Sequence, residues 1–179
     1  MVARLLALSV DAHDPEAQAA FWGGLLERPV DGPVVRAGAD PEFELRFGSG
    51  ATDKVQPNWI HLHLTSAAPG DQERTVARAL GLGATHLDVG QTPEELHVVL
   101  ADPEGNEFCV IEAGNRFLAG TGFLGELACD GTRDVGLFWS AALDWPLNWD
   151  QDEETSIQSP LGGTKVSWGG PPVRPKTGR

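Results

Sequence analysis

Alternating apolar and polar residues predict a chain of short strands interrupted by amphipathic helices. An apolar run over residues 4–10 predicts a strand, and Asp14-Pro15-Glu16 then supplies the N-cap, first-turn proline and first-turn acid of a helix start. We therefore predict a helix over 15–26, followed by strands over 33–37 and 42–47. On the buried face of the helix over 15–26 we expect Ala17, Ala20, Phe21, Gly24 and Leu25.

A second unit of the same kind follows a Gly/Ser/Pro-rich segment at residues 48–58. It consists of a predicted strand over 58–65, a helix over 70–82 whose inward face includes Val76, Ala79 and Leu80, and a strand over 84–89.

The stretch 96–112, LHVVLADPEGNEFCVIE, predicts the β-hairpin that closes this unit. Two β-rich runs flank a turn cluster formed by Asp102, Pro103, Gly105 and Asn106. If Leu100 pairs with Phe108, strand alternation places four residues on one face. These are His97, Val99, Cys109 and Ile111.

The first unit recurs after a Gly-rich connector at residues 113–122. Four residues recur at a constant displacement of 117 positions: Phe21-Trp22, Leu26 and Pro29 correspond to Phe138-Trp139, Leu143 and Pro146. A constant displacement of this kind indicates an internal repeat. The repeat predicts a third unit with a last strand at 164–168.

The order of units, the F-W-x-x-L-L segment and the D-P-x-G-N-x-F-x-V-x-E hairpin resemble the vicinal oxygen chelate superfamily, and within it the glyoxalase-like domain proteins. The resemblance implies an α+β fold of βαβββ modules, which pair and curl half-open mixed sheets into a ligand-holding cup. By this correspondence the modules span residues 4–50, 58–113 and 122–170.

Because such modules pair two at a time, we expect residues 1–115 to form a complete two-module domain and 116–170 to form a third module without a partner in the chain. Residues 171–179, rich in Gly, Pro and basic side chains, are expected to be a flexible tail. Either two chains join through their third modules as a homodimer, or the chain is a truncated four-module protein. An unpaired module exposes an apolar sheet face, which favours the homodimer.

Metal-dependent relatives hold a divalent ion with four ligands, and the resemblance carries these onto Ala7, Glu44, His61 and Cys109. Ala7 has no donor atom, and the sulfur of Cys109 suits zinc or copper better than hard ions. We therefore expect no metal or other cofactor. If a divalent metal is present, the expected ligands are Glu44 and His61, with Cys109 or His63, which shares the strand face of His61. The alternative is that both histidines are hydrogen-bonded strand residues and Cys109 is a core residue.

The third module's matching positions, Leu124 and Lys165, suggest no metal. A nucleophilic pair of Cys109 and His97 is a further possibility, although no oxyanion donor accompanies it. Trp22 and Trp139 are expected in the core, whereas Trp59 and Trp168, on strands, are candidates for stacking on a ligand.

The net charge of −13 argues against a nucleic-acid partner and favours cationic ligands. No apolar run reaches membrane-spanning length and the N-terminus has no signal-peptide pattern, so the expectation is a cytoplasmic protein without a membrane partner. Three functions remain open: metal-independent binding of a small, cationic or aromatic molecule; a metal-dependent lyase, isomerase or dioxygenase; and a non-catalytic assembly module. The expected ligand-binding residues are Glu44, His61, His63, Trp59, His97 and Cys109.

Overall fold

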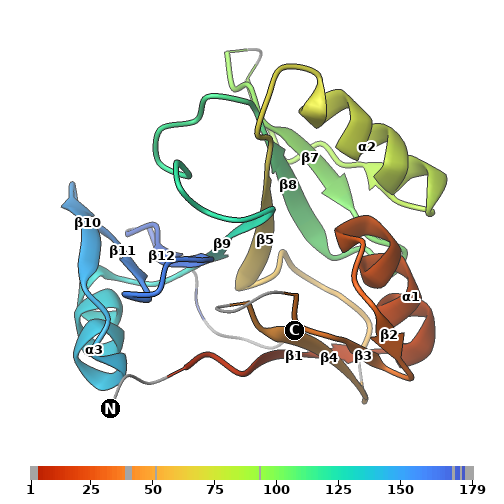
Figure 1. Cartoon of the computed structure of the whole chain (residues 1–179), viewed down its shortest axis with the longest axis horizontal. Coiled ribbons are helices and arrows are strands. Elements are labelled where there is room, and N and C mark those ends of the chain that lie inside the picture. Colours follow the sequence, from red (N-terminus) through yellow and green to blue (C-terminus); the bar gives the residue numbers. More distant parts are fainter. Residues whose placement is uncertain are drawn as a thin grey trace.

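The chain folds as three modules with one order of elements: a strand, a helix and three strands (Figure 1). A computed structural model describes residues 4–38, 42–50, 52–92, 94–170, 172, 173 and 175. The first module contains β1 (Ala7–Ala12), α1 (Pro15–Leu26), β2 (Val30–Asp31), β3 (Val34–Val35) and β4 (Glu44–Ser49). The second contains β5 (Ile60–Thr65), α2 (Asp71–Gly81), β6 (Thr85–His86), β7 (Val98–Ala101) and β8 (Glu107–Ile111). The third contains β9 (Leu124–Cys129), α3 (Arg133–Leu143), β10 (Leu147–Gln151), β11 (Glu154–Gln158) and β12 (Lys165–Trp168). The predicted α+β class of repeated βαβββ modules is confirmed.

The described strands form two mixed sheets. The first module makes a four-stranded sheet in the order β1-β4-β3-β2, and the other two modules share an eight-stranded sheet in the order β10-β11-β12-β9-β5-β8-β7-β6. The two modules join where β5 pairs antiparallel with β9, which sets His61 opposite Ala128 and His63 opposite Glu126. Figure 1 shows β5 and β9 adjoining at the centre, with α3 and α2 at opposite ends.

The expectation that the third module has no partner within the chain is therefore wrong. The first strands of the second and third modules each present an open edge, and pairing them satisfies the backbone groups of both. The predicted tail at 171–179 lies mostly outside the described residues. Among the described residues, no helix combines the length and apolar character that crossing a membrane requires.

The seam between β5 and β9 contains a bulge at Gly125. The register shifts between His63 and Leu64, so that His63 faces Glu126 while Leu64 faces Leu124. A Cβ atom on Gly125 would lie 2.1 Å from Thr65 Oγ1, so only glycine fits this close approach. The bulge thereby determines which residue of β9 stands opposite the second histidine.

The hairpin of β7 and β8 has the predicted register, with Leu100 opposite Phe108. Asp102 fixes its turn, because Oδ1 accepts hydrogen bonds from the backbone N–H groups of Glu104 (3.0 Å) and Asn106 (2.9 Å). Val99, Cys109 and Ile111 share one face and pack with Leu118. His97 lies just before β7.

The helix α1 begins and ends where the sequence predicts, and Asp14 Oδ1 caps it by accepting from Ala17 N at 3.0 Å. Its buried face differs from the prediction, since Ala17, Ala20 and Gly24 are exposed. The residues that are buried instead include Gln18, Ala19, Trp22, Gly23 and Leu26. In α2, Val76 and Ala79 face inward as predicted, but Leu80 is 39% exposed.

Trp22 is in the core, as expected, while Trp139 is not. The Trp22 ring lies 5.1 Å from that of Phe108, and its Nε1–H donates to Asp102 Oδ2 at 3.2 Å. Trp139 is 42% exposed and its neighbour Phe138 is 62% exposed. The difference arises because Phe108 of β8 packs against Phe21 and Trp22 of α1, whereas α3 stands at the far end of the eight-stranded sheet (Figure 1). The homodimer stays a prediction.

Candidate functional site

A cavity of about 540 Å³ lies on the inner face of the eight-stranded sheet, along the seam of β5 and β9. Strand alternation directs Trp59, His61 and His63 into it from one side of the seam, and Glu126 and Asp130 from the other. The segment between β8 and β9 contributes Asn115, Phe117 and Leu118, and the outer strands contribute Trp149, Glu154 and Ser167. The cavity is the cup that the resemblance implies, but the second and third modules build it.

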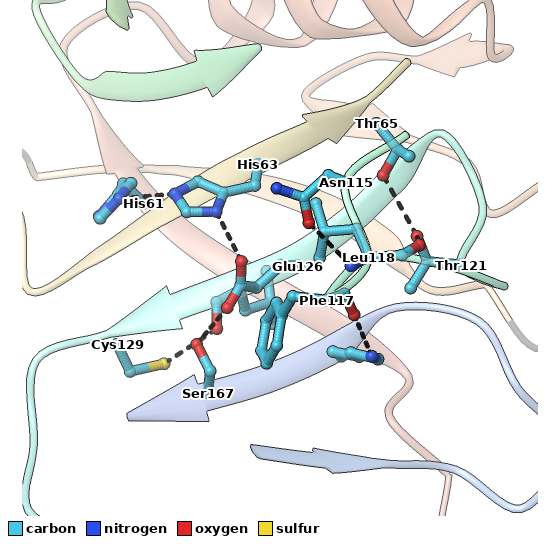
Figure 2. Close-up of polar contacts among 12 residues, drawn as sticks. His61, His63, Thr65, Asn115, Phe117, Leu118, Thr121, Glu126, Cys129 and Ser167 are labelled. Carbon is cyan, nitrogen blue, oxygen red and sulfur yellow. Dashed lines mark hydrogen bonds and ion pairs between the residues drawn. The ribbon is translucent and has the colours of Figure 1, made fainter. Parts of the chain in front are cut away.

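A chain of polar contacts crosses the floor of this cup (Figure 2). His61 Nε2 lies 2.9 Å from His63 Nε2, and His63 Nδ1 lies 2.6 Å from Glu126 Oε2. The other carboxylate oxygen of Glu126 accepts a hydrogen bond from Ser167 Oγ. Four side chains from three strands are thus ordered relative to one another.

His63 and Glu126 form a buried ion pair. Burial by itself would lower the pKa of His63, but hydrogen bonds with Cys109 and Glu126 and the charge of that carboxylate raise it to about 9. Burial would likewise raise the pKa of Glu126, yet the bonds from His63 and Ser167 keep it below its ordinary value. At neutral pH the ring is protonated and the carboxylate is ionised.

The structure brings together only part of the predicted site. One donor atom each from His61, His63 and Cys109 lies within 4.8 Å of the other two, and Trp59 lines the same cavity. Glu44 is not in this group; its carboxylate pairs instead with Arg36 at 3.0 Å and Arg46 at 2.7 Å on the first-module sheet. His97 is not part of the cluster of His61, His63 and Cys109 and does not line the cavity. Trp168, the other candidate for stacking, lines the cavity.

Comparison with known proteins identifies the family of the chain. The family model of the glyoxalase-like domain matches residues 7–111, more than half of the chain. The chain belongs to the glyoxalase-like domain family. That family is part of the vicinal oxygen chelate superfamily. No curated protein matches the sequence.

Solved structures of the superfamily extend the similarity to the third module. Glyoxalase I from Zea mays shares 15% sequence identity at a TM-score of 0.61, over 96% of this chain and 69% of that one. A putative dioxygenase from Bacillus subtilis shares 12% identity at a TM-score of 0.57, over 99% of this chain and 66% of that one. A glyoxalase/bleomycin resistance protein/dioxygenase family enzyme from Burkholderia phytofirmans shares 18% identity over 60% of this chain and 97% of that one, with a TM-score of 0.47. At these identities the likeness to the Zea mays and Bacillus subtilis structures shows the fold.

The resemblance to the family did not predict two residues of the site, Glu126 and Ser167. Counting back from Phe138 by the distance that separates Ala7 from Phe21 reaches Leu124, two positions before the carboxylate that enters the cup. A usable signal was present, because Glu126 is the single ionisable carboxylate within the apolar run of β9. A lone acid in such a strand is seldom buried without a partner.

Lys165, the other third-module candidate, anchors the segment that borders the cup. Its Nζ donates a hydrogen bond to the backbone carbonyl oxygen of Phe117 and lies 4.7 Å from the centroid of the Phe117 ring. Burial lowers the pKa of its ammonium group, against the opposing effect of Glu126. Lys165 therefore holds the segment around Phe117 in place and is not a metal ligand.

The donor atoms in the cup fit some metal ions and not others. Three converging donors of the type His, His and Cys suit a borderline ion such as Zn²⁺, and the contact of His63 Nδ1 with Glu126 is the arrangement that orients metal-bound imidazoles. A hard ion with four oxygen or nitrogen ligands does not fit, because Glu44 is paired elsewhere and Cys109 supplies sulfur.

Proposed function

We propose that this chain binds a small organic molecule in the cup between its second and third modules, without the four-ligand metal site of its metal-dependent relatives. One observation supports this most: a cavity of about 540 Å³ toward which His61, His63 and Glu126 converge. Ligand pockets of small molecules typically have such a volume and a few convergent polar groups among apolar walls. A pure assembly module would be expected to fill this space with apolar side chains.

The burial of the polar floor also favours binding over scaffolding. Glu126 is 5% exposed and Ser167 and His63 are held on it, so these charged and polar groups are kept away from bulk water. Breaking a buried ion pair is costly, but apolar side chains of the same volume in place of the whole pair would often stabilise the fold as well or better. Its retention at the floor of a cavity is typical of a site that recognises a ligand.

A cavity-filling substitution tests the proposal. In a fragment screen by thermal shift, the wild-type chain should gain stability with at least one fragment class, and Ala128→Phe, which places a ring in the cup, should abolish that gain. Ala142→Phe, on the exposed surface of α3, serves as the matched control and should retain it. Equal shifts in both variants would place the binding elsewhere and refute the proposal.

A second candidate is a metal-dependent activity of the lyase, isomerase or dioxygenase type, favoured by the His61, His63 and Cys109 cluster. In it the three side chains would hold a zinc-like ion, which would supply Lewis-acid chemistry when bound. Elemental analysis of untagged protein is the test, with His61→Ala expected to abolish metal uptake and His86→Ala, on β6, to leave it unchanged. Protein that stays metal-free after incubation with zinc, nickel, manganese or iron salts would exclude this candidate.

A further inference from the structure

We infer that two copies of this chain associate through α3, with Phe138 of each copy inserted into a cavity beside α3 of the other. This surface lies outside the cup, so the inference does not depend on what the cup binds. It rests on an apolar stripe along one side of α3, with the spacing of a single helical face. The stripe consists of Val135, Phe138, Trp139 and Ala142, which are all exposed.

The first module shows how the same stripe is covered elsewhere in this chain. A displacement of 117 positions relates it to the side of α1 that is formed by Gln18, Phe21, Trp22 and Leu25, and each of these is at most 4% exposed. Phe108 of the second module packs against both aromatic rings, at centroid distances of 6.1 Å from Phe21 and 5.1 Å from Trp22. In α1 this side of the helix is therefore a contact between modules.

In α3 a different side of the helix packs on its own sheet. A Cβ atom on the buried Gly136 would lie 2.0 Å from Thr155 Oγ1 and 3.1 Å from the Trp168 ring, so the helix approaches β11 and β12 closely there. The described residues leave the stripe open, since Phe138 is 62% and Trp139 is 42% exposed, and α3 stands at the end of the molecule opposite α1 (Figure 1). Exposed apolar residues that adjoin in this way mark a contact surface.

A second copy fits this surface because each copy offers both a protruding ring and a cavity. The Phe138 ring packs edge to face against Trp139, with centroids 5.3 Å apart, and Trp139 lines a cavity of about 700 Å³ together with Leu143 and the exposed Leu6. A two-fold axis can place the ring of each copy in the cavity of the other, which is the self-complementary contact of a symmetric dimer. The stripe has no charged side chain, so two chains of net charge −13 can meet there without burying a carboxylate.

The exposed area indicates a weak dimer. Covered aromatic side chains bury about 150–250 Å² each, so exposed fractions of 62% and 42% correspond to roughly 200 Å² for Phe138 and Trp139 together. A stable interface of standard size buries about 800 Å² on each partner, and the cavity wall and the flanks of the helix must supply the remainder. We therefore expect a dissociation constant on the order of 10 µM.

Sedimentation velocity of the full chain tests the inference. Between about 1 and 200 µM the wild type should pass from monomer to dimer. Phe138→Glu in the stripe and Leu6→Glu in the cavity wall should each weaken association at least about tenfold, because docking would bury an unpaired carboxylate. Leu96→Glu is the matched control: Leu96 is 66% exposed and precedes β7 in the second module, so this variant should associate as the wild type does.

Urea unfolding separates loss of the contact from loss of the fold. All three leucine and phenylalanine positions are exposed, so the unfolding midpoints of the dilute variants should match that of the wild type. A wild type that stays monomeric up to about 200 µM overturns the inference and leaves the stripe to a different protein. A dimer that survives Phe138→Glu or Leu6→Glu uses another surface and overturns it as well.

Discussion

Replacing Glu126 by glutamine should change how the stability of the protein depends on pH. The substitution keeps the size of the side chain and removes the carboxylate that, together with Cys109, raises the pKa of His63. Because the folded pKa of His63 is about 9 against 6.5 for the ordinary ring, its contribution to stability is fully present below about pH 6.5 and is lost as the pH rises through about 9. The lowered pKa of Glu126 acts at the other end, and its contribution is lost in acid.

The expected magnitude follows from the two pKa values of His63. A separation of one pH unit corresponds to about 1.4 kcal/mol, so the folded pKa of about 9 gives roughly 3 kcal/mol below pH 6.5 and slightly less at pH 7. The His63 side chain is only 18% exposed, so solvent screening reduces this little. The hydrogen bond with Cys109 raises the pKa of His63 as well, so the variant should lose the part of this contribution that comes from Glu126.

Urea unfolding between about pH 6 and 9.5, followed by tryptophan fluorescence, measures the effect. The wild type should lose about 2 kcal/mol between pH 7 and 9 as His63 loses its proton, and Glu126→Gln should be less stable at pH 7 with a flatter slope. Glu94→Gln, an exposed acid, should follow the wild-type curve. If Glu126→Gln retains the wild-type slope, or if NMR shows His63 titrating near 6.5 in the wild type, the ion pair is not as described.

Three further substitutions test the packing. Trp22→Ala should cost about 3–5 kcal/mol in urea unfolding because its buried ring leaves a cavity, while Trp139→Ala should cost less than about 1 kcal/mol; similar costs would contradict the different burial of the two rings. Gly125→Ala should cost about 1–3 kcal/mol through its collision with Thr65 Oγ1, and adding Thr65→Ala should recover part of that loss, whereas additive losses would show that the collision is absent. Asp102→Ala should cost about 2–3 kcal/mol by leaving the turn amides and the Trp22 indole unpaired, and a change below about 0.5 kcal/mol would exclude this role.

The candidate site was only partly predictable, and the limit lies at the module boundary. The donors on one strand, His61 and His63, follow from alternation, and Cys109 follows from the hairpin register. Glu126 does not follow, because its position opposite His63 depends on the pairing of β5 with β9 and on the bulge at Gly125. Residues from separate modules meet only through a long-range pairing that no local pattern encodes.

The sequence by itself determined the elements and their repetition. The N-cap Asp14, the Asp102 turn and the period of apolar residues act within a few positions along the chain, so α1 and the β7–β8 hairpin are specified locally. Only the tertiary structure decided which module partners which. The first strands of all three modules offer equivalent backbone edges, and the choice among them depends on how whole modules pack. That choice placed the cup between the second and third modules, and left Trp139 exposed where Trp22 is covered.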